Sequence, residues 1–142
     1  MEKTIITVEN IIQAPVATVW DYWTKPEHIT QWNNASPDWH TPRAESDLRT
    51  GGHFVYRMEA RDGSMGFDFG GAYDEVKDHE LIDSTLGDGR KLTILFTANG
   101  NTTAVKESFE AEGMNPVALQ RAGWQAILDN FKKYVEDSYG KK

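Results

Sequence analysis

The chain has 142 residues, which suits a single domain over residues 1–142 with one hydrophobic core. Its formal net charge of −7 is repelled by phosphate backbones and anionic lipid surfaces, so we expect no nucleic-acid partner. Cysteine is absent, which excludes disulfides, thiol nucleophiles and metal sites built on thiolates.

The N-terminal region predicts a strand and carries no targeting signal. Residues 4–12, TIITVENII, are rich in β-branched side chains, with Ile6, Val8 and Ile12 on one face. The first ten residues have neither an apolar signal core nor a cleavage site, so we expect a cytoplasmic protein. No apolar run approaches the roughly 20 residues that span a bilayer, so we expect no membrane insertion.

Two short helices are predicted next. From Pro15 the apolar positions, among them Val19 and Trp23, fall at helical spacing. Pro26 ends that helix and suits the first turn of a second one over residues 26–32. We expect the following residues, including Trp39 and His40, to form a loop.

The middle of the chain predicts consecutive strands. Residues 51–60 and 64–76 each alternate apolar and polar side chains, and Asp62-Gly63 between them is a strong hairpin signal. Further strands are predicted over residues 79–87, 90–98 and 102–112. Short turns between consecutive strands imply an antiparallel meander.

A long C-terminal helix completes the pattern. Asn115 suits an N-cap and Pro116 a first helical residue, and an apolar stripe follows at helical spacing up to Val135. The stripe must be buried against the concave face of the sheet. The fold class is therefore α+β: a curved antiparallel sheet wrapped around a long helix, with two short helices after the first strand.

Three stretches in this order, residues 14–33, 47–63 and 123–135, resemble the START-like (SRPBCC) superfamily. They are similar to the group related to the C-terminal domain of the activator of Hsp90 ATPase. The resemblance covers nearly the whole chain. It implies a helix-grip fold, in which the sheet grips the C-terminal helix and a cavity often lies between them.

The resemblance turns the inward-facing apolar residues into candidate pocket walls. Two interpretations remain open for each of them, plain core or ligand contact, and a mixture fits the set best. We expect Trp32 and Trp39 near the entrance, whereas the other candidates come from the strands and the C-terminal helix. These others are Phe54, Tyr56, Met58, Phe67, Phe69, Tyr73, Phe109, Trp124, Ile127, Leu128 and Phe131.

Gly123 interrupts the C-terminal helix, where glycine costs roughly 1 kcal/mol relative to alanine. One hypothesis is that the missing side chain leaves room for a ligand, or for Trp124 to lie against the sheet. The alternative is close packing against the turns of the sheet or the short helices.

Polar residues on apolar faces are the weak candidates for chemistry. Glu107 is in phase with apolar neighbours, so it would orient a ligand, act as a general base, lie at the sheet rim or pair with Arg57. Asn10 falls on the apolar face of the first strand. His40 is the best histidine for proton transfer, with Asp38 beside it, although an exposed loop histidine is the simpler interpretation.

The function favoured is binding of a small hydrophobic or aromatic ligand without chemistry. No nucleophile motif is present, the four histidines lie in separate elements, and we expect no metal and no cofactor. The resemblance also implies an alternative, a cyclase, hydratase or isomerase that uses the same cavity.

The third possibility is an interaction protein that acts on Hsp90. In the eukaryotic activator a separate N-terminal domain accompanies the family domain, and nothing in these residues matches it, so we do not expect Hsp90 as a partner. An edge strand or the aromatic mouth would offer a surface for a homodimer, but nothing in the sequence selects one.

Overall fold

A computed structural model describes residues 4–34 and 36–139. Seven strands and three helices follow one another along this part of the chain. Their bounds are β1 (Ile5–Ile12), α1 (Val16–Thr24), α2 (Pro26–Trp32), β2 (Trp39–Ser46), β3 (His53–Ala60), β4 (Gly66–Lys77), β5 (Leu81–Leu86), β6 (Lys91–Asn99), β7 (Thr102–Glu110) and α3 (Val117–Tyr139). The predicted α+β helix-grip class is confirmed.

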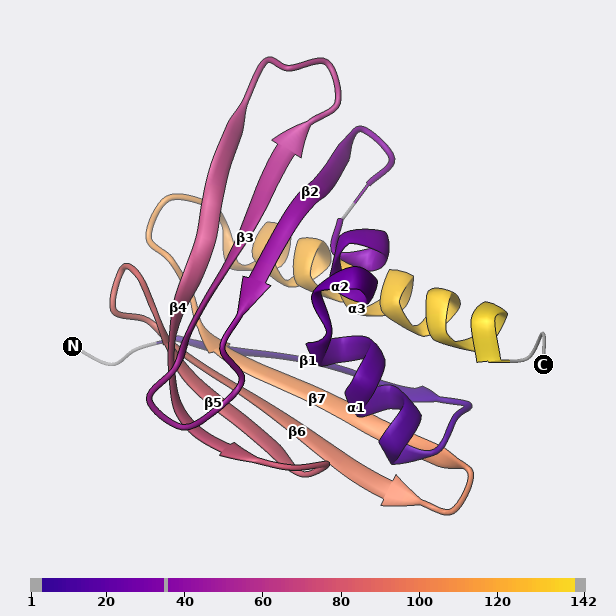
Figure 1. The fold of residues 1–142 in the computed structure, drawn as a ribbon. Coiled ribbons are helices and arrows are strands. Elements are labelled where there is room, and N and C mark those ends of the chain that lie inside the picture. The colour runs from indigo at the N-terminus through magenta and orange to yellow at the C-terminus, as the bar shows by residue number, and fades with distance from the viewer. Residues whose placement is uncertain (1–3, 35, 140–142) are drawn as a thin grey trace.

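The strands form one antiparallel sheet in the order β1-β7-β6-β5-β4-β3-β2. The six strands from β2 to β7 are a continuous meander, and β1 adds to its far edge beside β7. Figure 1 shows β2, β3 and β4 rising steeply from the plane of β6, β7 and β1, so the sheet is strongly curled.

Two adjacent glycines in β4 allow the strands on either side to approach closely. A Cβ at Gly70 would collide with the backbone oxygen of Phe54 on β3, and one at Gly71 would collide with that of Thr85 on β5. Both neighbouring strands therefore approach the β4 backbone more closely than any side chain permits. Gly123 in α3 differs from both, because a Cβ added there would meet no atom within 4 Å.

The long helix α3 lies across the concave face of the sheet, and α1 and α2 lie beside it (Figure 1). Leu128, Phe131 and Val135 of α3 are completely buried, as the predicted stripe requires. They join a core with Ile6 from the edge strand β1 and Val105 from its neighbour β7. Burial of such large side chains supplies about 1.5–3 kcal/mol each before entropy is counted.

The α3 helix is tied most closely to β1. The side-chain amide of Asn10 donates to the carbonyl of Leu128 at 3.3 Å and to the Asp129 carboxylate at 3.1 Å. Lys132 Nζ donates to the Ile11 carbonyl at 2.6 Å, one turn further along. Asn10, predicted on an apolar face, thus fastens the helix to the sheet.

One of the seven strands, β2, was not predicted from the sequence. The expectation of a loop at Trp39 and His40 is therefore wrong. The segment contains Pro42 and few β-branched residues, so it lacks the composition of a strand. It is an edge strand with a register shift between His40 and Arg43, which is where sheets accept proline.

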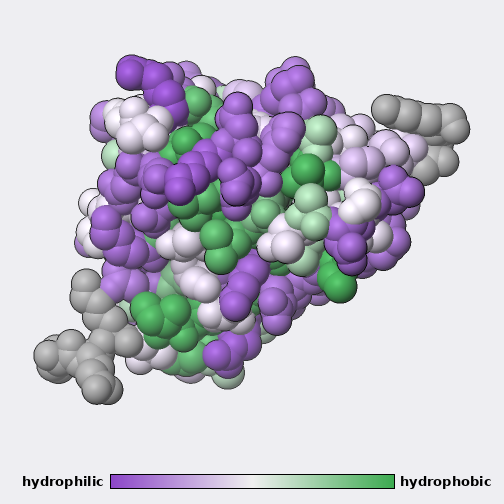
Figure 2. Space-filling model, turned by 90° about the horizontal axis from the view of Figure 1, so that it is seen from below, coloured by the Kyte–Doolittle hydropathy of each residue, from purple (hydrophilic) through white to green (hydrophobic). Residues whose placement is uncertain are grey.

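Exposed hydrophobic residues do occur outside the core. Figure 2 shows the molecule from below, with hydrophobic groups interspersed among hydrophilic ones. Ile5, Ile11 and Leu95 are among the large hydrophobic side chains that are more than 40% exposed. None of the helices in residues 4–34 and 36–139 is long and apolar enough to cross a bilayer.

Candidate functional site

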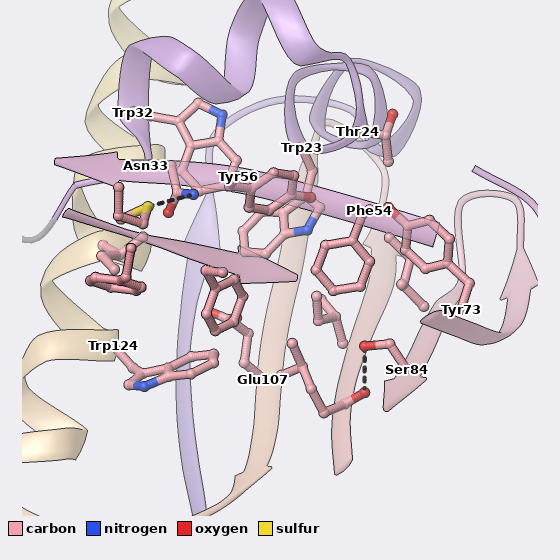
Figure 3. Close-up of a pocket in the computed structure, with 17 residues that line it drawn as sticks. Trp23, Thr24, Trp32, Asn33, Phe54, Tyr56, Tyr73, Ser84, Glu107 and Trp124 are labelled. Carbon is pink, nitrogen blue, oxygen red and sulfur yellow. Dashed lines mark hydrogen bonds between the residues drawn. The ribbon is translucent and has the colours of Figure 1, made fainter. Parts of the chain in front are cut away.

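A cavity of about 200 Å³ lies between the curled sheet and the helices (Figure 3). Its walls come from α1, α2, α3 and the strands β3 to β7. The lining residues are Trp23, Thr24, Trp32, Asn33, Phe54, Tyr56, Met58, Phe67, Phe69, Tyr73, Ile82, Ser84, Leu92, Ile94, Glu107, Trp124 and Ile127. The side chain of Phe67 is 49% exposed, so the cavity reaches solvent near the start of β4.

Most of the predicted wall residues line this cavity. They are Trp32, Phe54, Tyr56, Met58, Phe67, Phe69, Tyr73, Trp124 and Ile127. Six of them come from β3 and β4, and the alternation of these strands places all six on the concave face of the sheet, which is why the sequence identified them.

Phe109, Leu128 and Phe131 do not line the cavity. Each is at most 1% exposed and belongs to the core behind the cavity walls. These three residues are therefore plain core, which is one of the two interpretations that the sequence left open. Phe109 still contributes to the cavity indirectly, because its ring stacks on that of Trp124, which lines the cavity.

The two tryptophans expected near the entrance, Trp32 and Trp39, lie in different environments. Trp32 is 3% exposed, with its ring centroid 4.8 Å from those of both Trp23 and Phe131, so it lies deep in the molecule. Its indole nitrogen donates to the carbonyl of Tyr22 at 2.9 Å. Trp39 lies outside the lining but faces Phe67 at the open end, with ring centroids 6.0 Å apart.

Gly123 lies outside the lining as well. A Cβ added there would meet nothing within 4 Å, so the close-packing explanation of this glycine is wrong. The position is one turn before Ile127, which lines the cavity, and two turns before Asn130, whose amide donates to the Trp32 carbonyl on α2. Gly123 therefore occupies the same side of α3, beyond the reach of α2.

Several wall residues were not predicted, namely Trp23, Thr24, Asn33, Ile82, Ser84, Leu92 and Ile94. The strand residues among them alternate with less buried neighbours, as in β6, where Leu92 and Ile94 are buried and Thr93 between them is half-buried. That alternation was the available signal. The contribution of α1 and α2 had none, because it depends on how the helices dock.

Glu107 is the one acidic residue in the lining, and it is 4% exposed. It sits on the concave face of β7, between Val8 of β1 and Ile94 of β6 in the register. Burial raises the pKa of its carboxyl from 4.5 to about 8, and no hydrogen bond or cation opposes this shift. Figure 3 shows the side chain among the wall residues.

The pairing of Glu107 with Arg57, one of the predicted alternatives, does not occur. The Arg57 guanidinium binds Glu59 at 2.8 Å and Asp68 at 3.4 Å on the other face of the sheet. The alternative of a rim position is also wrong, because Glu107 is buried at the middle of its strand.

Two tyrosines add phenol groups to the polar part of the cavity. The Tyr73 hydroxyl lies 2.7 Å from the Ser46 hydroxyl of β2. Burial raises the pKa of Tyr56 well above 10, and the nearby Tyr73 and Glu107 raise it further. Burial also raises the pKa of Tyr73, against the hydrogen bond from Ser46. Both phenols therefore stay protonated at neutral pH and can act as hydrogen-bond donors.

His40 does not belong to this group. It is in β2, opposite Glu59, and its Nε2 lies 3.8 Å from the Glu59 carboxylate. Asp38, the predicted partner, uses its backbone carbonyl to accept from Arg61. Within the described residues, no three side chains of His, Cys, Asp or Glu come together as a metal site would require.

The chain is similar to known proteins in both sequence and structure. The family model for activator of Hsp90 ATPase homolog 1-like proteins matches residues 13–136. An AHSA1-like protein from Aeromonas hydrophila is 42% identical, with 95% of this chain and 94% of that chain covered and a TM-score of 0.89. Chr148 from Cytophaga hutchinsonii is 52% identical, with 96% and 95% covered and a TM-score of 0.81.

More distant structures share the fold alone. Protein NE0264 from Nitrosomonas europaea is 18% identical, with 96% of each chain covered and a TM-score of 0.78. No curated protein matches the chain.

Proposed function

The chain belongs to the family of activator of Hsp90 ATPase homolog 1-like proteins, and from that premise we propose that it binds a small hydrophobic or aromatic molecule in its cavity. The observation that carries the proposal is the cavity itself. It is lined mainly by aromatic and aliphatic side chains, with few polar groups. This composition is typical of small-molecule sites.

The volume limits the ligand. About 200 Å³ is somewhat larger than the ~150 Å³ apolar cavity that accepts benzene, and smaller than the ~300 Å³ at which drug-sized sites begin. A single ring with a short substituent fits these limits. A larger ligand would extend beyond the cavity towards solvent at its open end near Phe67.

Binding without chemistry is the simplest use of this arrangement. An isomerase or hydratase needs an acid and a base that converge on the substrate. The possible contributors are Glu107, Tyr56, Tyr73 and His40, and of these His40 lies outside the lining. The buried phenols of Tyr56 and Tyr73 are held protonated by their surroundings.

Two measurements test the proposal. Native mass spectrometry of the purified protein reveals whether a stoichiometric small molecule is already bound. Two-dimensional NMR titration with single-ring aromatic compounds should then shift the resonances of residues on β3, β4 and α3 that line the cavity. Shifts confined to other surfaces, or none with any compound, would overturn the proposal.

A matched pair of variants adds a control. Ser84 is 1% exposed and its side chain lines the cavity, so Ser84→Phe would fill much of the space. Thr97→Phe adds the same ring on the exposed face of β6. We expect Ser84→Phe to abolish the titration response and Thr97→Phe to preserve it, with thermal unfolding as the check that both variants fold.

A further inference from the structure

The polar groups of the cavity are unequally satisfied. The Thr24 hydroxyl donates to the Trp20 carbonyl at 2.8 Å, and the Ser84 hydroxyl to the Leu92 carbonyl at 3.4 Å. The Asn33 amide contacts the Met58 sulfur at 3.7 Å. The Glu107 carboxyl is the exception: the residue is 4% exposed and lines the cavity, and no other residue in the described part of the chain donates a hydrogen bond to it. A buried acceptor without a partner is costly, and a ligand that supplies a donor removes that cost.

The charge of the lining restricts the donor. The residues that line the cavity include no lysine, arginine or histidine. Above about pH 8, where Glu107 is ionised, a carboxylate or phosphate ligand would therefore meet a like charge without any compensating cation, which is unfavourable in a buried site. A neutral or cationic ligand avoids this repulsion.

The aromatic walls favour a cation over a neutral donor. The aromatic residues that line the cavity include Trp23, Trp32, Trp124, Tyr56 and Phe69. Electron-rich ring faces attract ammonium groups, and the attraction is stronger where water is excluded. A carboxylate on one side and several rings around it form the combination that binds organic cations.

We propose that the cavity selects a small hydrophobic amine, bound as its ammonium ion with the carboxylate of Glu107 as the counter-ion. This inference rests on the proposed function, because it requires the cavity to bind a ligand at all. The hydrophobic part of the amine occupies the aromatic space, and its nitrogen is held at β7. The aryl or alkyl part supplies the apolar burial, and the ion pair supplies the selectivity.

Glu107 is the group whose titration would control the binding. The other elements around it contribute Tyr56 from β3 and Tyr73 from β4, whose pKa values are raised, so they stay protonated. Val8, Ser84 and Ile94 from β1, β5 and β6 do not titrate, nor do the lining residues of α1, α2 and α3. Binding of an ammonium ion must therefore release the proton of Glu107 below about pH 8.

The test uses three probes that share one ring: benzylamine, benzyl alcohol and benzoate. Their dissociation constants are measured by NMR titration of the intact protein between pH 6 and pH 9. We expect benzylamine to bind at least tenfold more tightly than benzyl alcohol at pH 8, and benzoate not to bind. Benzylamine affinity should fall by up to tenfold per pH unit below pH 8, whereas benzyl alcohol affinity stays constant.

Variants assign the effect to one carboxyl. Glu107→Gln should weaken benzylamine at pH 8 by at least tenfold and change benzyl alcohol by less than threefold. Glu9→Gln removes the same charge from an exposed position on β1 and should change neither. The pH series on the unaltered protein keeps the test valid if Glu107→Gln does not fold.

The outcomes separate the two proposals. Equal affinity for the amine and the alcohol, or benzylamine binding that is independent of pH and of Glu107, overturns the amine inference and leaves the hydrophobic cavity in place. Tight binding of benzoate at pH 9, where Glu107 is ionised, overturns it as well. Failure of all three probes to bind overturns both this inference and the proposed ligand site for single-ring molecules.

Discussion

The indole of Trp124 stacks on the ring of Phe109, with ring centroids 3.9 Å apart and ring planes inclined by 18°. The same indole meets Phe69 edge to face, with centroids 5.9 Å apart. One side chain of α3 thereby touches β7 and β4, two strands that lie three positions apart in the sheet. Because it also lines the cavity, Trp124 closes the space where the curled sheet approaches the helix.

Truncation of this side chain should cost both stability and binding. Trp124→Ala removes the stack on Phe109 and enlarges the cavity, so we expect the free energy of unfolding to fall by about 2–4 kcal/mol. Affinity for benzyl alcohol should fall because one wall is lost, whereas Trp124→Phe should retain most of both. Urea denaturation and NMR titration measure the two effects. Trp39→Ala, at a tryptophan outside the lining, is the comparison and should weaken the affinity less than Trp124→Ala does.

The buried carboxyl of Glu107 predicts a stability that depends on pH. Its pKa is about 8 in the folded protein against 4.5 in the unfolded chain, so the folded state binds the additional proton between these values. The stabilisation is therefore complete below about pH 4.5 and is lost as the pH rises through about 8, by up to ~1.4 kcal/mol per unit. Glu107→Gln cannot lose this proton, so its stability relative to the unaltered protein should rise with pH.

Urea denaturation at pH 5, 7 and 9 measures this difference directly. Glu9→Gln provides the comparison for a carboxyl on the exposed face of the sheet, and its curve should run parallel to that of the unaltered protein. If the Glu107→Gln curve is parallel too, Glu107 is not protonated in the folded protein at neutral pH.

The glycines of the chain are predicted to respond in opposite ways to alanine. Gly123 is in the interior of α3 with open space around its Cβ position, so Gly123→Ala should stabilise the protein by about 0.5–1 kcal/mol. At Gly70 the new Cβ would collide with the Phe54 backbone oxygen, so Gly70→Ala should destabilise it. Thermal unfolding of both variants makes the comparison, and a loss of stability in Gly123→Ala would contradict the open environment of that residue.

His40 should be dispensable for binding and nearly so for stability. Its distance of 3.8 Å from Glu59 describes a weak surface pair, and Glu59 already binds Arg57 at 2.8 Å. We expect His40→Ala to change the free energy of unfolding by no more than about 0.5 kcal/mol and to leave ligand titrations unaltered. A clear loss of ligand affinity in this variant would mean that β2 contributes to the site.

The sequence predicted those parts of the fold that depend on local periodicity. Phe54 and Met58 were assigned to the concave face because they alternate with polar neighbours, and Glu107 was noticed because it interrupts an apolar face. The strand β2 was not predicted because its extended conformation depends on pairing with β3 more than on its own residues. Pro42 in particular argues against a strand unless the segment is known to be at an edge.

The site was less predictable than the fold. Whether Phe131 or Ile127 reaches the cavity depends on the rotation of α3 against the sheet, since both belong to the same apolar stripe. The deep position of Trp32 depends on the docking of α2 between α3 and β2, which no repeat in the sequence encodes. Periodicity identifies the face on which a residue lies, but tertiary packing decides what occupies the space in front of it.

The pair Gly70-Gly71 has a consequence for how ligand range could change over time. Because β3 and β5 approach its backbone too closely for a Cβ, a larger residue at either position would push these strands away from β4. The dimensions of the cavity, to which β3, β4 and β5 all contribute walls, then depend on the spacing of these strands as well as on the wall side chains. Two relatives with identical walls would accept molecules of different size if only this pair differed between them.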